Sequence, residues 1–342
     1  MNVKKKDINI YIIKYLIKLR ANINNGSLYY ACKSGNLSII KYLVKHGSDV
    51  NKKVFLCGET PLFNACLSGN EVIVKYLVEH GADINKEKWS GETPLFKACE
   101  NESEAIVKYL VEHGADINKI NKKGETPLFK VCENGNEARV KYLVEHGADI
   151  NKADDDGETP LFKVCENGNK TIVRYLVDHG ADINKKNKKG ETALFKVCEN
   201  GNEVIVKYLV DHGADTNKEK WNGETPLFKA CENESEAIVK YLVEHGADIN
   251  KMGNDFKIPL FIAYKNGNGN ETIVKYLIEH GANINEMDKD GETLLIKACS
   301  NGNEALIKYL VEKGADGYTC RSGNRAIIKF IIKQGKKIYK KN

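Results

Sequence analysis

The feature that most constrains this chain is a repeat with a period of 33 residues. The hexapeptide Gly-Glu-Thr-Pro-Leu-Phe, or a near copy of it, returns once per period along most of the chain. These copies begin at Gly58, Gly91, Gly124, Gly157, Gly190 and Gly223, and degenerate copies begin at Phe256 and Gly291. A fixed period of this length is typical of stacked repeats, in which each unit contacts only its neighbours.

The repeat also sets the expected domain organisation. A chain of 342 residues usually forms more than one domain, but the unbroken pattern predicts a single solenoid over residues 1–342. Nine units occupy residues 25–316. Residues 7–24 resemble the second half of a unit, and residues 317–342 resemble a unit without its opening loop, followed by a basic tail. We therefore expect half-repeat caps at both ends.

The charge distribution leaves two interpretations open. Residues 1–20 carry a net charge of +5 and residues 317–342 carry +8, whereas the whole chain carries +5, so the body between them is acidic. Basic ends can bind nucleic acid or an anionic surface, but solenoid caps also need charged outer faces for solubility. We favour the cap interpretation over nucleic-acid binding. No apolar run is long enough to span a bilayer, so we expect no membrane span.

The cysteines follow the repeat. Nine of the ten occupy one repeat position: Cys32, Cys66, Cys99, Cys132, Cys165, Cys198, Cys231, Cys299 and Cys320. Stacked helices lie about 8–10 Å apart, which exceeds the roughly 7 Å Cα separation that a disulfide tolerates. These thiols are expected to be small buried apolar groups in a reducing, intracellular compartment. Cys57 lies in a loop and is expected to be more exposed.

Each unit has the signals of two short helices. In the unit that begins at Gly91, Thr93 and the following Pro predict the start of a helix over residues 94–101, with Thr93 as the N-cap. Asn or Ser then caps a second helix, here over residues 104–113, and Gly114 ends it. The polar segment up to the next Gly forms a hairpin arm with a turn at its tip. Because such short helices do not persist alone, the units must stack, which predicts an all-α dominated solenoid.

This pattern resembles the ankyrin repeat, whose signature is T-P-L-H-x-A. The match rests on T-P-L-F-x-A, I-V-x-x-L and G-A-D-I-N at 33-residue spacing, over residues 7–335. Phe stands where the family has His, which implies extra apolar burial, at Phe63, Phe96, Phe129, Phe162, Phe195 and Phe228. The resemblance implies a non-catalytic protein-binding solenoid whose arm tips and first helices line a concave surface. It also implies that Asn85 and its counterparts are possible substrates for enzymatic hydroxylation.

Two further rows of residues have structural explanations. All eight His precede the Gly that ends the second helix, where an imidazole can bond the last carbonyls of the helix. Sites one repeat apart cannot share a Zn²⁺ ion, so we expect no metal. Tyr recurs four residues before each His and is interpreted as packing. Because His and Cys recur in these scaffold roles, and no phosphate-binding Gly loop is present, we expect neither an enzyme nor a cofactor or small-molecule substrate.

The positions that vary between repeats indicate where recognition takes place. Variation concentrates at the arm tips, which also carry the only two Trp residues, Trp89 and Trp221. Exposed Trp is a frequent interface anchor, and the charged tips between them alternate in sign. The predicted partner-binding residues are Trp89, Ser90, Glu92, Glu100, Asn101, Lys122, Lys123, Glu133, Asp155, Asp156, Glu166, Lys188, Lys189, Glu199, Trp221, Asn222, Glu224 and Glu232. The alternative is that the tips are duplicated loops under little constraint, because residues 86–116 recur almost unchanged at 218–248.

Two departures from the pattern give local predictions. The Trp-bearing units replace the Gly between their helices with Glu102 and Glu234, which is strained if that position is left-handed. We therefore expect Glu102→Gly to raise the melting temperature. The unit at Phe256 also has Tyr264 in place of Cys and a two-residue insertion at residues 268–269. It is expected to be a bend, a weak seam or a special contact, with Phe256 either exposed or packed against Tyr264.

The function that fits these observations best is a protein-binding scaffold or adaptor, monomeric and located in the cytoplasm or the nucleus. One alternative is the targeting or substrate-receptor subunit of an enzymatic assembly such as a ubiquitin ligase. Another is weak binding of nucleic acid or an anionic surface through the basic termini. The sequence does not name the partner.

Overall fold

The computed structural model describes residues 26–101, 103–264 and 270–316. The half-repeat caps predicted at residues 7–24 and 317–342 lie outside these ranges, as do Glu102 and the insertion at residues 268–269. Within the described ranges the regular structure is helical throughout, which confirms the all-α class. Two compact units, Met1–Ala181 and Asp182–Asn342, are described in turn.

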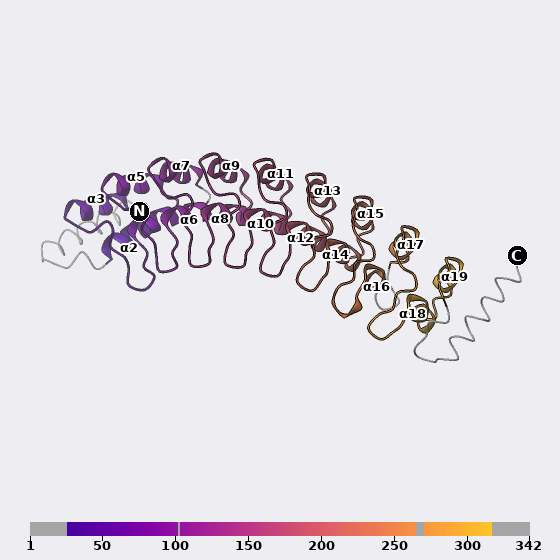
Figure 1. The fold of residues 1–342 in the computed structure, drawn as a ribbon. Helices are drawn as coiled ribbons and strands as arrows, with labels where there is room; N and C mark the ends of the chain where they lie inside the picture. The colour runs from indigo at the N-terminus through magenta and orange to yellow at the C-terminus, as the bar shows by residue number, and fades with distance from the viewer. Residues whose placement is uncertain (1–25, 102, 265–269, 317–342) are drawn as a thin grey trace, which may run out of the picture. The chain divides into compact units, whose positions relative to one another are not determined.

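In the first unit the helices alternate between two rows (Figure 1). The row of first helices consists of α2 (Ser27–Ser34), α4 (Pro61–Leu67), α6 (Pro94–Glu100), α8 (Pro127–Asn134) and α10 (Pro160–Asn167). The row of second helices consists of α3 (Leu37–Lys45), α5 (Glu71–Glu79), α7 (Glu104–Glu112), α9 (Glu137–Glu145) and α11 (Lys170–Asp178). Successive first helices pack side by side, and each packs against the second helix of its own repeat. The arms project on the side of the first helices.

The second unit repeats this arrangement. Its first helices are α12 (Ala193–Asn200), α14 (Pro226–Glu232), α16 (Pro259–Ala263) and α18 (Leu294–Ser300). Its second helices are α13 (Glu203–Asp211), α15 (Glu236–Glu244), α17 (Glu271–Glu279) and α19 (Glu304–Glu312). A short 3₁₀ helix, η1 (Asn254–Phe256), forms the tip before α16.

The helix starts confirm most of the predicted caps and correct some. Thr Oγ1 accepts a hydrogen bond from the backbone N–H three residues on in α4, α8, α10 and α12, at 3.1–3.3 Å. Thr93 was predicted to cap α6 in this way, but its Oγ1 is buried without a partner. Thr225 behaves likewise at α14, where Phe228 N–H donates instead to the Thr225 carbonyl at 3.0 Å.

The second helices show the same division. Asn136 accepts from the N–H of Arg139 at 3.0 Å, and the other Asn caps do the same in their repeats. Ser103 and Ser235, which were also predicted to cap, accept no such bond. The helices of both Trp-bearing repeats are therefore less completely capped than those of the neighbouring repeats.

The ends of the second helices confirm the interpretation of the His row. In His113 the Nδ1 atom lies 2.7 Å from the carbonyl oxygen of Tyr109, and the two rings stack with centroids 3.9 Å apart. The same bond and ring contact recur at all eight His residues, so each imidazole satisfies a C-terminal carbonyl of its helix. Gly114 follows with φ 90°, the left-handed conformation that ends the helix.

The core contains the residues that the repeat pattern places there. The six Phe that replace the family's His are at most 3% exposed, which confirms their burial. Seven of the Cys at the shared position are buried, Cys299 is half-buried and Cys320 lies outside the described ranges. None of the described cysteines forms a disulfide. Cys57 is half-buried, so it is less exposed than its loop position suggested.

One buried residue breaks the pattern. Where other second helices bury Ile or Leu, α9 carries Arg139, which is only 4% exposed. Its Nη1 donates to the carbonyl of Cys99 at 2.6 Å and to that of Asn101, whereas its Nε has no partner. The guanidinium thus binds carbonyls at the C-terminal end of α6, where the inter-helix Gly is missing and Asn101 is extended (φ −85°, ψ 161°).

The nearly identical unit at α14 solves the same problem differently. The second helix of the next repeat, α17, carries Ile273 at the position of Arg139. Glu234 itself adopts φ 54°. The predicted left-handed conformation is therefore confirmed at Glu234. Two almost identical repeats have different turns, and the next repeat supplies a cation to only one of them.

Candidate protein-binding surface

Each arm ends in a tight turn closed by backbone hydrogen bonds. In the arm before α8, Asn121 N–H donates to the Glu125 carbonyl at 3.0 Å, and Gly124 N–H donates to the Asn121 carbonyl at 3.0 Å. The tips before α6, α10, α12, α14 and α18 contain the same two bonds. The backbone is thus fixed, and the side chains at the two residues before the Gly project from it.

In these six tips the first residue of the turn is of two kinds. Asn121 and Asp154 use their side-chain oxygen to accept two backbone N–H groups of their own turn, as Asn187 and Asp288 also do. Burial raises the pKa of Asp154. The two Trp-bearing tips have Lys88 and Lys220 instead. Lys88 forms an ion pair with Glu92 at 2.6 Å and lies 5.0 Å from the centre of the Phe63 ring.

Neighbouring tips are joined to one another. In the first unit Trp89 N–H donates to Cys57 O, Lys122 N–H to Ser90 O and Asp155 N–H to Lys123 O, at 3.3, 2.8 and 2.8 Å. In the second unit Trp221 N–H donates to Lys189 O and Asn254 N–H to Asn222 O, at 3.4 and 2.8 Å. Within each unit these bonds bring the predicted tip residues into one continuous row.

The two tryptophans take part in this junction between tips. The indole of Trp89 lies over Gly58, where an added Cβ would come within 2.6 Å of its Cδ2 atom. Its Nε1 donates to the Phe55 carbonyl at 3.3 Å, and Lys53 Nζ lies 5.0 Å from the ring centre. Trp221 lies over Gly190 and donates to the Lys188 carbonyl at 2.6 Å. Trp89 nevertheless remains 53% exposed and Trp221 70%.

The charged tip residues differ from the first-helix glutamates in their pairing. Lys122, Lys123, Asp155 and Asp156 are exposed, and their charged groups form no ion pair in the described part of the chain. Lys188 and Lys189 are exposed in the same way in the second unit. These side chains have their charges available to a partner.

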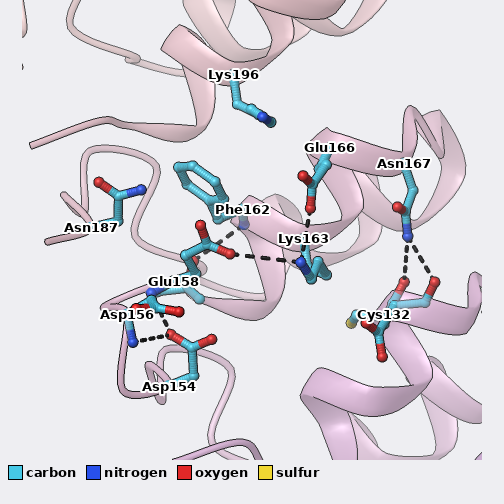
Figure 2. A network of polar contacts seen from close by, with 12 residues as sticks. Cys132, Asp154, Asp156, Glu158, Phe162, Lys163, Glu166, Asn167, Asn187 and Lys196 are labelled. Carbon is cyan, nitrogen blue, oxygen red and sulfur yellow. Dashed lines mark hydrogen bonds and ion pairs between the residues drawn. The ribbon is translucent and has the colours of Figure 1, made fainter. Parts of the chain in front are cut away.

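The glutamates are all occupied. Each pairs with the Lys three residues earlier on its own helix, as Figure 2 shows for Glu166 and Lys163 at 2.8 Å. The corresponding pairs involve Glu133, Glu199 and Glu232, at 2.6–2.9 Å, and Glu100 with Lys97. The bond to Lys196 lowers the pKa of Glu199. Although burial alone would raise it, the bonds to Lys220 and Asn222 lower the pKa of Glu224.

Three other predicted residues contribute mainly to the framework. Asn101 Nδ2 donates to the carbonyls of Cys66 and Leu67 at 3.1 and 2.7 Å, and Asn167 binds Cys132 and Glu133 in the same way (Figure 2). Ser90 Oγ is buried without a partner. Asn222 Oδ1 accepts from Glu224 N–H at 3.2 Å.

A second row of amides joins the repeats at the base of the arms. Asn85 Nδ2 donates to the Gly114 carbonyl at 3.0 Å, and its Oδ1 accepts from Asp116 N–H at 2.8 Å. The counterparts Asn51, Asn118, Asn184, Asn217 and Asn250 make the same two bonds. The residue implied as a hydroxylation target is therefore an exposed connector between successive repeats.

Comparison with known proteins identifies this arrangement. The family model for ankyrin repeats (3 copies) matches residues 28–121, 117–187, 179–253 and 251–319. The chain belongs to the ankyrin-repeat family. A similar solved structure is the ankyrin repeat domain of Bcl-3, a unique member of the IkappaB protein family; it is 27% identical, with a TM-score of 0.58 over 64% of this chain and 98% of that one. The comparison with curated proteins gives no match.

The ankyrin tips also enclose a small acidic hollow in the first unit. Its volume is about 450 Å³, and its lining includes Glu125, Glu133, Asp154, Asp155 and Asp156, with Lys123 and Lys163 as its cations. Phe129 also contributes to its lining. Among the described residues no group of three or more His, Cys, Asp or Glu is placed to hold a metal ion. In the same ranges no helix has the length and apolar character needed to cross a membrane.

Sequence reasoning missed two exposed residues of the ankyrin surface. Phe55 is 91% exposed and Leu56 is 87% exposed, and both lie on the first tip of the first unit. Their signal was the apolar composition of that one tip, whereas the later tips of the same unit are polar apart from Trp89. Arg139 was also missed, although comparison of the repeats would have shown it as the only charge at a core position of a second helix.

Proposed function

We propose that this ankyrin-repeat protein is a non-catalytic scaffold that binds a protein partner along its arm tips. Ankyrin repeats generally mediate protein–protein interaction. The observation that carries the proposal is the difference in pairing: the first-helix glutamates are neutralised by lysines of their own helices, whereas Lys122, Lys123, Asp155 and Asp156 have no ion pair in the described structure. Charged groups on a fixed backbone give specificity at little ordering cost.

The tips suit this role because the framework holds them from three directions. Each turn is closed by its own backbone bonds, it is bonded to the neighbouring tip, and the amide of Asn85 or a counterpart joins the base of its arm to the next repeat. A partner therefore meets a preorganised row of side chains. We further propose that the protein is a monomer. We also propose a reducing compartment, the cytoplasm or the nucleus, because none of the described cysteines forms a disulfide and most of their thiols are buried.

The test is affinity purification with three forms of the full chain. One variant reverses the unpaired tip charges by Lys122→Glu, Lys123→Glu, Asp155→Lys and Asp156→Lys. The matched control exchanges an ion pair on a second helix, Glu104→Lys with Lys108→Glu, which keeps the pair and the net charge. We expect a directly binding protein to be recovered by the wild type and the control and lost with the tip variant. Equal recovery by all three forms would remove the tips as the binding surface.

A further inference from the structure

The first two tips of the first unit carry an exposed apolar surface. We define the apolar tip pair as Phe55, Leu56 and Trp89, which are 91%, 87% and 53% exposed. Tyr30 is 56% exposed, and its ring lies on the arm side of α2, where an added Cβ on Gly26 would meet both Tyr30 and Val54. Large apolar side chains that remain this exposed on adjacent turns are characteristic of interaction surfaces.

The backbone holds these side chains outward. The arm between α3 and α4 is one residue longer than the next, so Gly58 N–H reaches back four residues to the Val54 carbonyl, at 2.8 Å, where the following tips reach back three. Phe55 and Leu56 occupy this widened turn. The indole of Trp89 then bonds to the Phe55 carbonyl at 3.3 Å and covers Gly58, which fixes the two tips to each other. The apolar tip pair is therefore preorganised.

The charges around it are positive. Lys53 Nζ lies 5.0 Å from the centre of the Trp89 ring, and no ion pair involves Lys52, Lys53 or Lys86 in the described part of the chain. The following tips of the same unit carry the unpaired Lys122 and Lys123, and then the unpaired Asp155 and Asp156. Along the tip row of this unit the surface is thus apolar, then basic, then acidic.

We propose that the apolar tip pair anchors an extended peptide segment of the protein partner, with its large apolar residues against Phe55, Leu56 and Trp89. The segment then presents acidic residues to Lys122 and Lys123 and a basic residue to Asp155 and Asp156. Successive repeats are about 10 Å apart, and an extended chain advances about 3.3 Å per residue. The segment therefore advances about three residues per tip and spans the row with roughly ten residues. This inference rests on the proposed function and specifies the chemistry of its ligand.

Two other occupants fit the row less well. An anionic membrane would suit Phe, Leu, Trp and Lys, but the same row places Asp155 and Asp156 where they would be repelled. A two-fold dimer centred on the apolar tip pair would leave Lys122 and Lys123 without acidic partners, because the surface meets itself. A dimer centred between the basic and acidic tips would leave the apolar tip pair uncovered. A peptide with an ordered sequence of side-chain types matches all three parts.

The test is selection from a displayed library of random twelve-residue peptides against the full chain. The variant Phe55→Ser/Leu56→Ser removes the two most exposed side chains of the anchor, and both are too exposed for their loss to disturb folding. A second variant exchanges the tip charges by Lys122→Asp, Lys123→Asp, Asp155→Lys and Asp156→Lys. We expect peptides selected on the wild type to carry aromatic or aliphatic anchors at one end and acidic residues about three to six positions away. Their affinity should fall at least about tenfold on the serine variant.

The charge-exchanged variant should keep the apolar anchors and invert the charge preference of the selected peptides. The proposal is overturned if no peptide is enriched, or if the serine variant selects the same peptides with equal affinity. It is also overturned if the serine substitutions leave peptide affinity unchanged and instead abolish one of two other activities. These are binding to phosphatidylserine vesicles and concentration-dependent dimerisation measured by sedimentation. If the serine variant still recovers every partner of the wild type while the tip-charge variant loses them, this inference fails and the proposed function stands.

Discussion

Single positions decide how each repeat closes its helix turn. Between the two helices most units have Gly with φ near 70°, as at Gly135 and Gly201. Glu234 holds the same conformation with φ 54°, whereas the unit of α6 has Asn101 extended and Arg139 bonded to its carbonyl. Without the glycine, one copy of the repeat holds Glu234 in a strained left-handed conformation, and the other uses a different turn whose carbonyls bind a buried cation.

This contrast predicts that Glu234→Gly stabilises the protein. The substitution removes a left-handed non-glycine residue, which is worth about 1 kcal/mol. We expect the midpoint of urea unfolding, followed by far-ultraviolet circular dichroism, to increase. The matched control Gly201→Glu places the same residue at φ 69° and should lower the midpoint by a similar amount. A control that falls while Glu234→Gly changes nothing would show that the local bonds of Glu234 offset its strain.

At the scale of the element, the arm is stabilised by close approach between successive tips. A Cβ added to Gly124 would lie 2.8 Å from Asp155 N in the next tip, so this glycine is needed for space as well as for its φ of 74°. Phe256 provides a natural exception, because it occupies the same position with φ 56° and 57% exposure. Among the described residues no backbone bond joins its tip to the tip of Asp288. Because more than half of Phe256 is exposed while Tyr264 is buried, the exposed alternative is confirmed.

Two glycines with the same backbone conformation should therefore differ in their tolerance of a side chain. Gly147, at the end of α9, has φ 90° and open space around an added Cβ. Gly147→Ala should cost about 1 kcal/mol, from backbone strain alone. Gly124→Ala should cost at least about twice as much, because the bond between Asp155 and Lys123 is also disturbed. Denaturant midpoints of the two variants decide this, and equal losses would mean that the tips separate freely.

The same scale shows what sequence could predict. The helix bounds of the unit at Gly91 were expected at residues 94–101 and 104–113 and are found at Pro94–Glu100 and Glu104–Glu112, because Thr-Pro and Gly fix the ends. The tips were correctly expected to carry the exposed Trp and charged residues. What failed depends on side-chain geometry in space. Ser103 accepts no capping bond, and Trp89 and Arg139 reach into the preceding repeat to contact Gly58 and α6. Such contacts are set by distances that a repeat pattern does not contain.

At the scale of the whole molecule, the repeat places a buried cysteine thiol in one first helix after another. Each first helix from α2 to α14 buries one thiol at the same position. Burial raises the pKa of Cys99 from its ordinary value of 9.0 to about 12, and it also raises the pKa of Cys132 and Cys165. The pKa shift of one thiol would change the free energy of unfolding little, but the shifts of all these thiols have the same sign and add.

The consequence is a stability that falls at alkaline pH. Above pH 9 the unfolded thiols lose their protons while the native thiols keep them, so the unfolded state binds fewer protons and unfolding becomes easier as pH rises. Each thiol contributes about 1.4 kcal/mol per pH unit in the window from about 9 to 12, and nothing at neutral pH.

We expect urea midpoints to be level from pH 7 to 8 and to fall steeply between pH 9.5 and 10.5. The variant Cys132→Ala/Cys165→Ala, although less stable at pH 7, should show a slope shallower by about two thiols' share. An unchanged slope would assign the alkaline loss to other groups, such as Tyr109, whose pKa burial also raises.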